Sequence, residues 1–218
     1  MKSTTYFLLC SVFILMIFLL SVSANAQYIV DTGPGQSGGG YALINWQDSY
    51  TQYLAVEFSI DNTYILSSIV GWMTHWDWSD QGRPINVDFV IYGDGGNIPD
   101  VNNELFHQVA SIPADIMPQW HGISNLDWTL TSGTYWLAFE VRQPQFSEED
   151  DAPLSMPINA PNPLQGALYG EGFGYVPKSL SIGARIQATV VPEPVSSTLF
   201  IAGGATLGFR RFRNKFKK

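Results

Sequence analysis

Residues 53–60 read YLAVEFSI, and this short stretch sets the expected class of the fold. Every second side chain is apolar, and the apolar set consists of Leu54, Val56, Phe58 and Ile60. The alternate set is mixed in polarity and consists of Tyr53, Ala55, Glu57 and Ser59. A period of two residues is typical of a β-strand with one face on a core and the other toward water. The stretch therefore predicts a half-buried strand.

The same alternation recurs along the chain between residues 27 and 191. It covers residues 85–91, 126–130, 135–141 and 180–188. Because the turn residues 131–133 separate two of these segments, residues 126–141 predict a hairpin. No segment of this region combines a 3.6-residue apolar period with helix caps. We therefore expect an all-β domain, built as an antiparallel, jelly-roll-like β-sandwich.

The first 26 residues have the features of a secretory signal peptide. Lys2 precedes an apolar run at residues 6–20, and the small residues Ala24 and Ala26 follow it. Signal peptidase cleaves after small residues in an A-x-A arrangement. We therefore expect a cut after Ala26, which leaves residues 27–191 as one exported domain with a sizeable core.

The exported domain is strongly acidic. Between residues 27 and 191 there are 18 Asp and Glu but only four Lys and Arg, a net charge of −14. Nucleic-acid binding needs a basic surface, so this charge excludes a nucleic-acid partner. The only cysteine, Cys10, lies in the predicted signal peptide. The domain therefore has no disulfide, no thiol nucleophile and no cysteine-ligated metal, and its stability must come from packing.

Residues 192–218 form a third segment with a distinct composition. The segment begins with Pro192, Glu193 and Pro194 and continues with an apolar run that ends at Phe209. Six basic residues follow, namely Arg210, Arg211, Arg213, Lys215, Lys217 and Lys218. The stretch 195–209 makes about 22 Å of helix, which spans a hydrocarbon core of about 30 Å only marginally. Basic residues favour the cytoplasmic side, so we expect a single transmembrane helix with its C-terminus inside.

This order of Pro-Glu-Pro, short apolar helix and basic end resembles the PEP-CTERM sorting tail of exported bacterial proteins. The resemblance implies export by a Gram-negative-type bacterium, transient retention in the inner membrane, and cleavage near residues 192–194 by an exosortase. It also implies a final location at the cell surface or in the extracellular matrix of bacteria that produce exopolysaccharide. Residues 52–58, 92–99 and 132–137 are similar to the β-sandwich ectodomains, of unassigned function, that precede such tails.

A tryptophan-rich segment is the main candidate for ligand binding. If residues 72–78 are extended, Trp72, Trp76 and Trp78 share one face of a strand. A row of indole rings can stack on the apolar faces of sugar rings, which predicts polysaccharide binding. Tryptophan also builds β-sandwich cores, and Val70 has the same parity as these residues. The alternative is therefore that the whole row, with Val70, points into the core.

Acidic loops provide a second candidate site, for calcium. Asp94, Asn97, Asp100 and Glu104 offer hard oxygen ligands within one loop, and residues 148–151 form another acidic cluster. Neither group has the spacing of an EF-hand loop, so calcium is a candidate ligand without an assigned binding site. Solvated turn residues are the alternative interpretation.

No catalytic residue follows from the sequence. His121, Ser124 and Asp127 have the residue types of a hydrolytic triad, but no oxyanion-hole motif accompanies them. Carboxylates are numerous enough for a glycosidase pair, whose separation the sequence does not specify. We therefore expect a non-enzymatic exported protein that binds polysaccharide and needs no cofactor. A glycan-active hydrolase and a calcium-dependent adhesion module are the alternatives.

Overall fold

The computed structural model describes residues 26–36, 39–46, 50–75, 84–113, 117–143 and 154–191, and every regular element among them is a β-strand. The strands are β1 (Gln27–Asp31), β2 (Gly40–Trp46), β3 (Tyr50–Ile60), β4 (Tyr64–His75), β5 (Ile85–Asp94), β6 (Pro99–Ile112), β7 (Gln119–Leu130), β8 (Gly133–Glu140), β9 (Leu154–Pro157), β10 (Gly166–Gly170), β11 (Gly174–Lys178) and β12 (Ala184–Val190). The all-β prediction is confirmed. Residues 1–25 of the predicted signal peptide and the predicted tail 192–218 lie outside the described residues.

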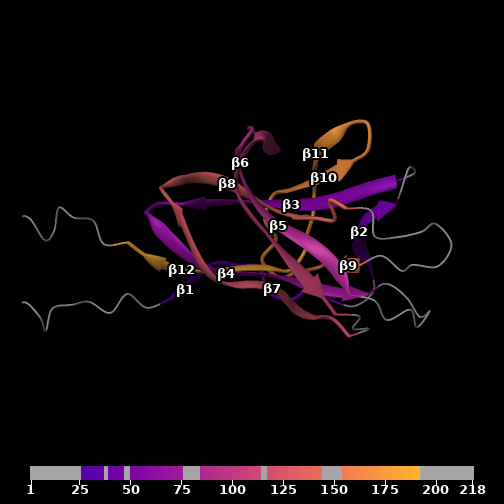
Figure 1. The fold of residues 1–218 in the computed structure, drawn as a ribbon, viewed down its shortest axis with the longest axis horizontal. Helices are drawn as coiled ribbons and strands as arrows, with labels where there is room; N and C mark the ends of the chain where they lie inside the picture. The colour runs from indigo at the N-terminus through magenta and orange to yellow at the C-terminus, as the bar shows by residue number, and fades with distance from the viewer. Residues whose placement is uncertain are drawn as a thin grey trace, which may run out of the picture.

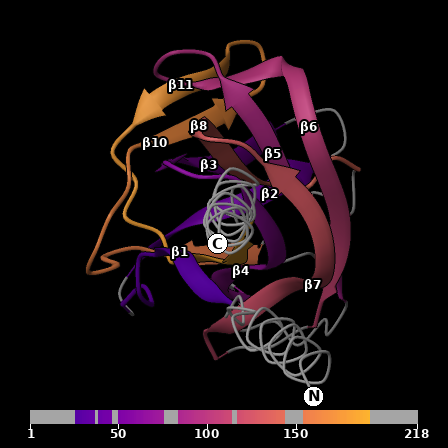
Figure 2. The same cartoon turned by 90° about the vertical axis from the view of Figure 1, so that its left-hand side faces the viewer.

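The strands form one curled antiparallel sheet (Figure 1). Its main path runs β1-β12-β4-β9-β2-β3-β8-β5-β6, while β7 pairs with β4, β10 with β3, and β11 with β10. Figure 2 looks along the long axis and shows β3, β8, β5 and β6 arching over β1, β4 and β7. The curl therefore gives the sheet an inner side, where the core lies, and an outer side.

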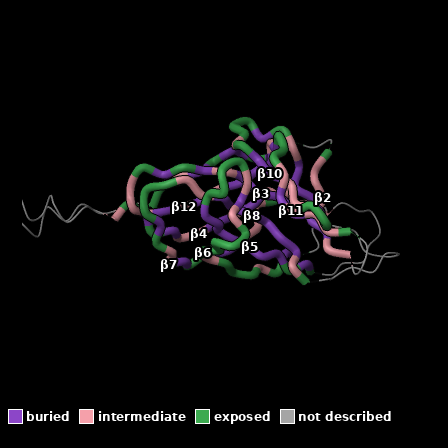
Figure 3. The backbone as a smooth tube through the Cα atoms, turned by 90° about the horizontal axis from the view of Figure 1, so that it is seen from above, coloured by how far each residue is buried: buried purple, intermediate pink, exposed green. Residues whose placement is uncertain are grey.

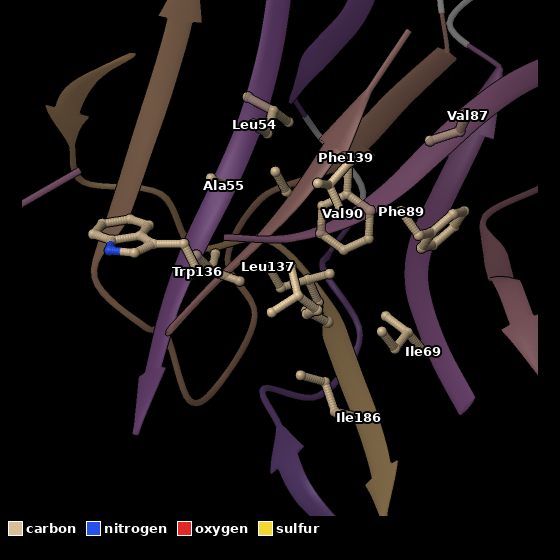
Figure 4. Close-up of a cluster of buried hydrophobic side chains, with 14 of the residues drawn as sticks. Leu54, Ala55, Ile69, Val87, Phe89, Val90, Trp136, Leu137, Phe139 and Ile186 are labelled. Atoms are coloured by element: carbon tan, nitrogen blue, oxygen red, sulfur yellow. The ribbon is translucent and has the colours of Figure 1, made fainter. Parts of the chain in front are cut away.

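Side chains from both halves of the curl meet in one core. Leu137 and Phe139 of β8 point toward Ile186 of β12 (Figure 4). Ile69 of β4 lies beside them, and Phe89 of β5 packs edge-on against Phe139 with ring centroids 5.4 Å apart. All five side chains are buried. Because burying one such side chain is worth roughly 1.5 to 3 kcal/mol, this contact between the halves stabilises the curl.

The strand predicted at residues 53–60 is confirmed within β3, and its apolar face is buried: Leu54, Val56, Phe58 and Ile60. On the other face, however, Tyr53 and Ala55 are buried as well. The cause is the β10–β11 hairpin, which folds back over this part of the outer side until Tyr175 of β11 reaches Glu140 of β8. The sheet is therefore covered on both sides here, which alternation alone does not predict.

The hairpin predicted at residues 126–141 is wrong. β7 and β8 follow one another along the chain, but β7 pairs with β4, whereas β8 pairs with β3 and β5. Tyr64 pairs with Leu130, and Ile60 pairs with Gly133, so the β3–β4 and β7–β8 connections lie side by side. Both connections cross together from one half of the curl to the other. Alternation reports which face of a strand is buried, and it does not identify the neighbouring strand.

The free edges of β6 and β7 approach each other without sharing a ladder. Phe106 and Trp128 close this seam by stacking, with ring centroids 5.2 Å apart and ring planes 9° apart. The rest of β6 is largely exposed (Figure 3). Its irregular register near residues 100–104 and its charged side chains oppose pairing with another chain.

β7 approaches β4 most closely at Gly122, opposite Val70. A Cβ atom at Gly122 would overlap the carbonyl oxygen of Ile69 and lie 2.7 Å from the Cα of Val70. Because both are backbone atoms, Gly122→Ala should push the strands apart and destabilise the fold by about 1 to 3 kcal/mol. Gly133→Ala is the control, since its Cβ would meet only the Tyr135 side chain at 3.3 Å. Urea unfolding compares the variants, and equal stability would contradict the close approach.

Candidate functional site

β4 places Trp72 on the outer side of the curled sheet. Ile69 and Met73 of the same strand are buried in the core, whereas Val70 and Trp72 are half-buried. The interpretation that Val70 points into the core together with Trp72 is therefore wrong. It failed because both faces of β4 carry apolar residues, so that parity alone does not show which face meets the core.

Trp72 is the one member of the predicted tryptophan row that the structure describes. β4 ends at His75, and Trp76 and Trp78 lie outside the described residues. The neighbouring strand β7 supplies a partner that the sequence did not indicate, because Trp120 pairs with Trp72 in the ladder. The two rings meet edge to face, with centroids 5.2 Å apart and planes 62° apart.

An arginine of β12 completes this aromatic group. The guanidinium carbon of Arg185 lies 4.0 Å from the ring centroid of Trp120 and 5.3 Å from that of Tyr28 on β1. Its Nε donates to Oδ1 of Asp31 at 2.8 Å, and the same oxygen accepts from the N–H of Gly33 at 2.9 Å. Partial burial opposes ionisation of Asp31, but these two bonds lower its pKa. We call the following set the outer aromatic face: Tyr28, Trp72, Trp120 and Arg185.

The residues of the predicted calcium loop have protein partners of their own. Oδ1 of Asp94 accepts from Nε1 of Trp136 at 3.1 Å and from the N–H of Gly96 at 3.0 Å. Oδ1 of Asp100 accepts from the N–H of Asn102 at 3.1 Å. Bonds to an N–H two residues ahead are typical of Asp in turns.

Glu104 belongs to an ion-pair chain on the outer side. Its Oε2 lies 2.6 Å from Nη2 of Arg142, and its Oε1 lies 2.8 Å from Nδ1 of His107. The hydrogen bond from Arg142 lowers the pKa of Glu104.

Asn97, the remaining residue of the predicted calcium loop, is exposed. Within the described residues, no three His, Cys, Asp or Glu side chains form a group that could hold a metal ion. Residues 148–151 lie outside that part of the chain, and calcium binding stays a prediction.

A buried carboxylate network that the sequence did not predict lies beneath the β10–β11 hairpin. Glu140 is only 3% exposed. Its Oε1 accepts from the hydroxyls of Tyr92 at 3.0 Å and Tyr175 at 2.7 Å, and its Oε2 accepts from Nε of Arg142 at 2.7 Å. Arg142 also donates through Nη2 to the hydroxyl of Tyr92 at 2.8 Å. The network ties β5, β8 and β11 together.

Tyrosines pack around this carboxylate. Tyr169 stacks on Tyr53 with centroids 4.9 Å apart and meets Tyr175 edge to face at 5.3 Å. Burial, and secondarily the negative charge of Glu140, raises the pKa of Tyr53, Tyr92 and Tyr175. The phenols therefore stay protonated and donate, while the carboxylate accepts. Since each group is already paired, this network serves stability.

The residue types of a hydrolytic triad on β7 do not come together. His121 pairs with Gly71 of β4, and Ser124 pairs with Ser68. Because His121 and Ser124 are three residues apart on an extended strand, their side chains leave opposite faces of the sheet. Ser124 and Asp127 are exposed. These residues therefore provide no nucleophile and base within reach of each other.

No family model matches this chain, and no curated protein matches its sequence. No helix in the described ranges is long and apolar enough to cross a membrane. Two features of the strands themselves bear on function. One is the outer aromatic face, and the other is the position of the two ends of the domain.

Proposed function

We propose that this chain is an exported, non-enzymatic protein of the cell surface or extracellular matrix that binds polysaccharide through the outer aromatic face. The observation that carries the proposal is the stacking of Arg185 on Trp120 beside Trp72. Aromatic rings suit the apolar faces of sugars, and adjacent donors suit their hydroxyl groups.

The architecture that best fits the curled sheet is a jelly-roll-like β-sandwich.

The ends of the described domain support export and sorting. β1 begins at Gln27, immediately after Ala26, and β12 ends at Val190, shortly before the predicted sorting motif. Gln27 pairs with Ala188, so both ends leave the domain side by side (Figure 1). A signal peptidase cut after Ala26 leaves β1 complete, and an exosortase cut near residues 192–194 leaves β12 complete.

Polysaccharide binding is tested with the full chain purified in mild detergent. A panel of soluble polysaccharides in affinity gel electrophoresis should include at least one that retards the protein. Trp120→Ala should abolish this retardation, because it removes the ring on which Arg185 stacks. Phe173→Ala is the matched control, since Phe173 is a 61% exposed aromatic residue in the β10–β11 turn. If no polysaccharide retards the wild-type chain, the proposal is wrong.

The sorting tail is tested in the producing bacterium. Replacing Pro192, Glu193 and Pro194 by alanine should leave export intact and keep the protein in the inner membrane, because the basic end still stops transfer. Cell fractionation measures the distribution. Alanines at residues 195–197 serve as the control and should not change it. Equal release of the 192–194 variant and the wild type would remove the support for an exosortase.

A glycan-active hydrolase is the alternative function, and Glu57 is its candidate acid. Partial burial, together with the nearby charge of Asp94, raises the pKa of Glu57. A glycosidase acid needs a raised pKa and a second carboxylate about 5 to 10 Å away across the sugar, and Glu57 meets the first of these two conditions. Release of reducing ends from a bound polysaccharide, lost in Glu57→Gln, would favour the hydrolase over the binding protein.

A further inference from the structure

We propose that the outer aromatic face selects neutral polysaccharides, and that Arg185 recognises them by donating hydrogen bonds to sugar hydroxyls from its two Nη groups. This inference rests on the proposed function and names the ligand class. Arg185 is held in place by other residues of the protein without a ligand. Asp31 accepts from its Nε, and its guanidinium lies over the rings of Trp120 and Tyr28. A donor held in place loses little conformational freedom on binding.

The terminal nitrogens of Arg185 are available to a ligand. No residue in the described ranges accepts a hydrogen bond from either Nη group, since the pair with Asp31 uses Nε. The arginine fork therefore has four N–H bonds left, in a fixed plane. Tyr28, which is 55% exposed, provides an aromatic surface next to this fork. A sugar ring that rests on Tyr28 can bring its hydroxyls to the Nη groups.

The row of the sheet next to Arg185 carries polar, uncharged side chains. The ladder aligns Gln187 of β12, Ser68 of β4 and Ser124 of β7 in the next row. The hydroxyl of Ser68 donates to Oε1 of Gln187 at 3.3 Å. Amide and hydroxyl groups both donate and accept, so this row matches the hydroxyls of further sugar units along a chain.

Charge decides between neutral and carboxylated polysaccharides. An arginine fork also suits a carboxylate, which is the competing ligand. However, Asp31 already neutralises Arg185, and residues 27–191 carry a net charge of −14. A polyanion would therefore meet repulsion from the domain without a local excess of positive charge. A neutral polysaccharide meets no such repulsion.

The experiment compares a galactomannan and a mixed-linkage β-glucan with alginate, a carboxylated polysaccharide, using the full chain in mild detergent. At least one neutral probe should bind with an affinity that changes little between low and physiological salt. Alginate should not bind. Arg185→Gln should weaken the neutral probe roughly tenfold, the effect of losing one or two hydrogen bonds. Lys178→Gln is the control, because it removes a cation from the exposed end of β11 and changes the net charge equally.

Tyr28→Ala provides a second variant, because its exposed side chain can be removed without opening the core. It should also weaken neutral binding roughly tenfold and leave the melting temperature nearly unchanged. Salt-sensitive binding of alginate, or neutral binding that survives both Arg185→Gln and Tyr28→Ala, would overturn this inference and leave the polysaccharide function standing. Binding of no polysaccharide would overturn the function itself.

Discussion

Glu140→Ala is expected to destabilise the domain by about 3 to 5 kcal/mol, the usual cost of removing one partner of a buried ion pair. The variant leaves the hydroxyls of Tyr92 and Tyr175 without their acceptor and Nε of Arg142 without its carboxylate. The β10–β11 hairpin would then lose its polar attachment to β8. Unfolding in urea, followed by tryptophan fluorescence and circular dichroism, measures the change.

Two controls separate this network from the general effect of removing a carboxylate. Glu171→Ala removes an exposed glutamate from the β10–β11 turn and should change stability by less than about 0.5 kcal/mol. Glu140→Gln keeps an acceptor oxygen for the tyrosines and should lie between the two alanine variants. If Glu140→Ala is no more costly than Glu171→Ala, the buried network does not hold the hairpin.

The domain should lose stability steeply above pH 10. Burial, followed by the charge of Glu140, raises the pKa of Tyr53, Tyr92 and Tyr175 from the ordinary value of 10.0. The folded chain therefore keeps three protons that the unfolded chain releases. The contribution of these tyrosines to the free energy of unfolding is fully present below pH 10 and is lost as pH rises above it. Three protons correspond to about 4 kcal/mol per pH unit.

Denaturant unfolding at several pH values above 10 tests this slope, together with the ultraviolet absorbance of tyrosinate. Tyr175→Phe should reduce the slope by about one proton, or about 1.4 kcal/mol per pH unit. The absorbance of the three tyrosines should rise only as the domain unfolds. Gradual titration of all tyrosines in a folded domain would contradict the buried network.

The sequence predicts single strands well because the side-chain period depends on local residues alone. The inward positions of β3 illustrate this, since the apolar set of residues 53–60 is buried. Glu140 shows the limit of the same reasoning. Its polarity and parity predict an exposed residue, but Tyr175 covers it from a strand 35 residues later in the chain. The local sign of the Glu140–Arg142 ion pair is the i, i+2 spacing, which places the two side chains on the same face of an extended segment.

The outer aromatic face was predictable only in part for a similar reason. Trp72 stands out in the sequence because it belongs to a tryptophan-rich segment. Trp120 and Arg185 become its neighbours through the ladders of β4 with β7 and β12, whose order no local pattern specifies. Sequence therefore located one residue of the site, and strand pairing supplied the others.

The position of β12 has a mechanical consequence. β12 ends at Val190, pairs with β4 along its whole length on one side and pairs with β1 through residues 185–188 on the other. A pulling force that enters the domain through Val191 acts parallel to β12, so both ladders are loaded in shear and their hydrogen bonds share the load. Strand β1, an edge strand with one ladder, could be peeled away one bond at a time if it were pulled sideways. The chain thus leaves the domain from a strand that is paired on both sides, and not from the edge strand β1.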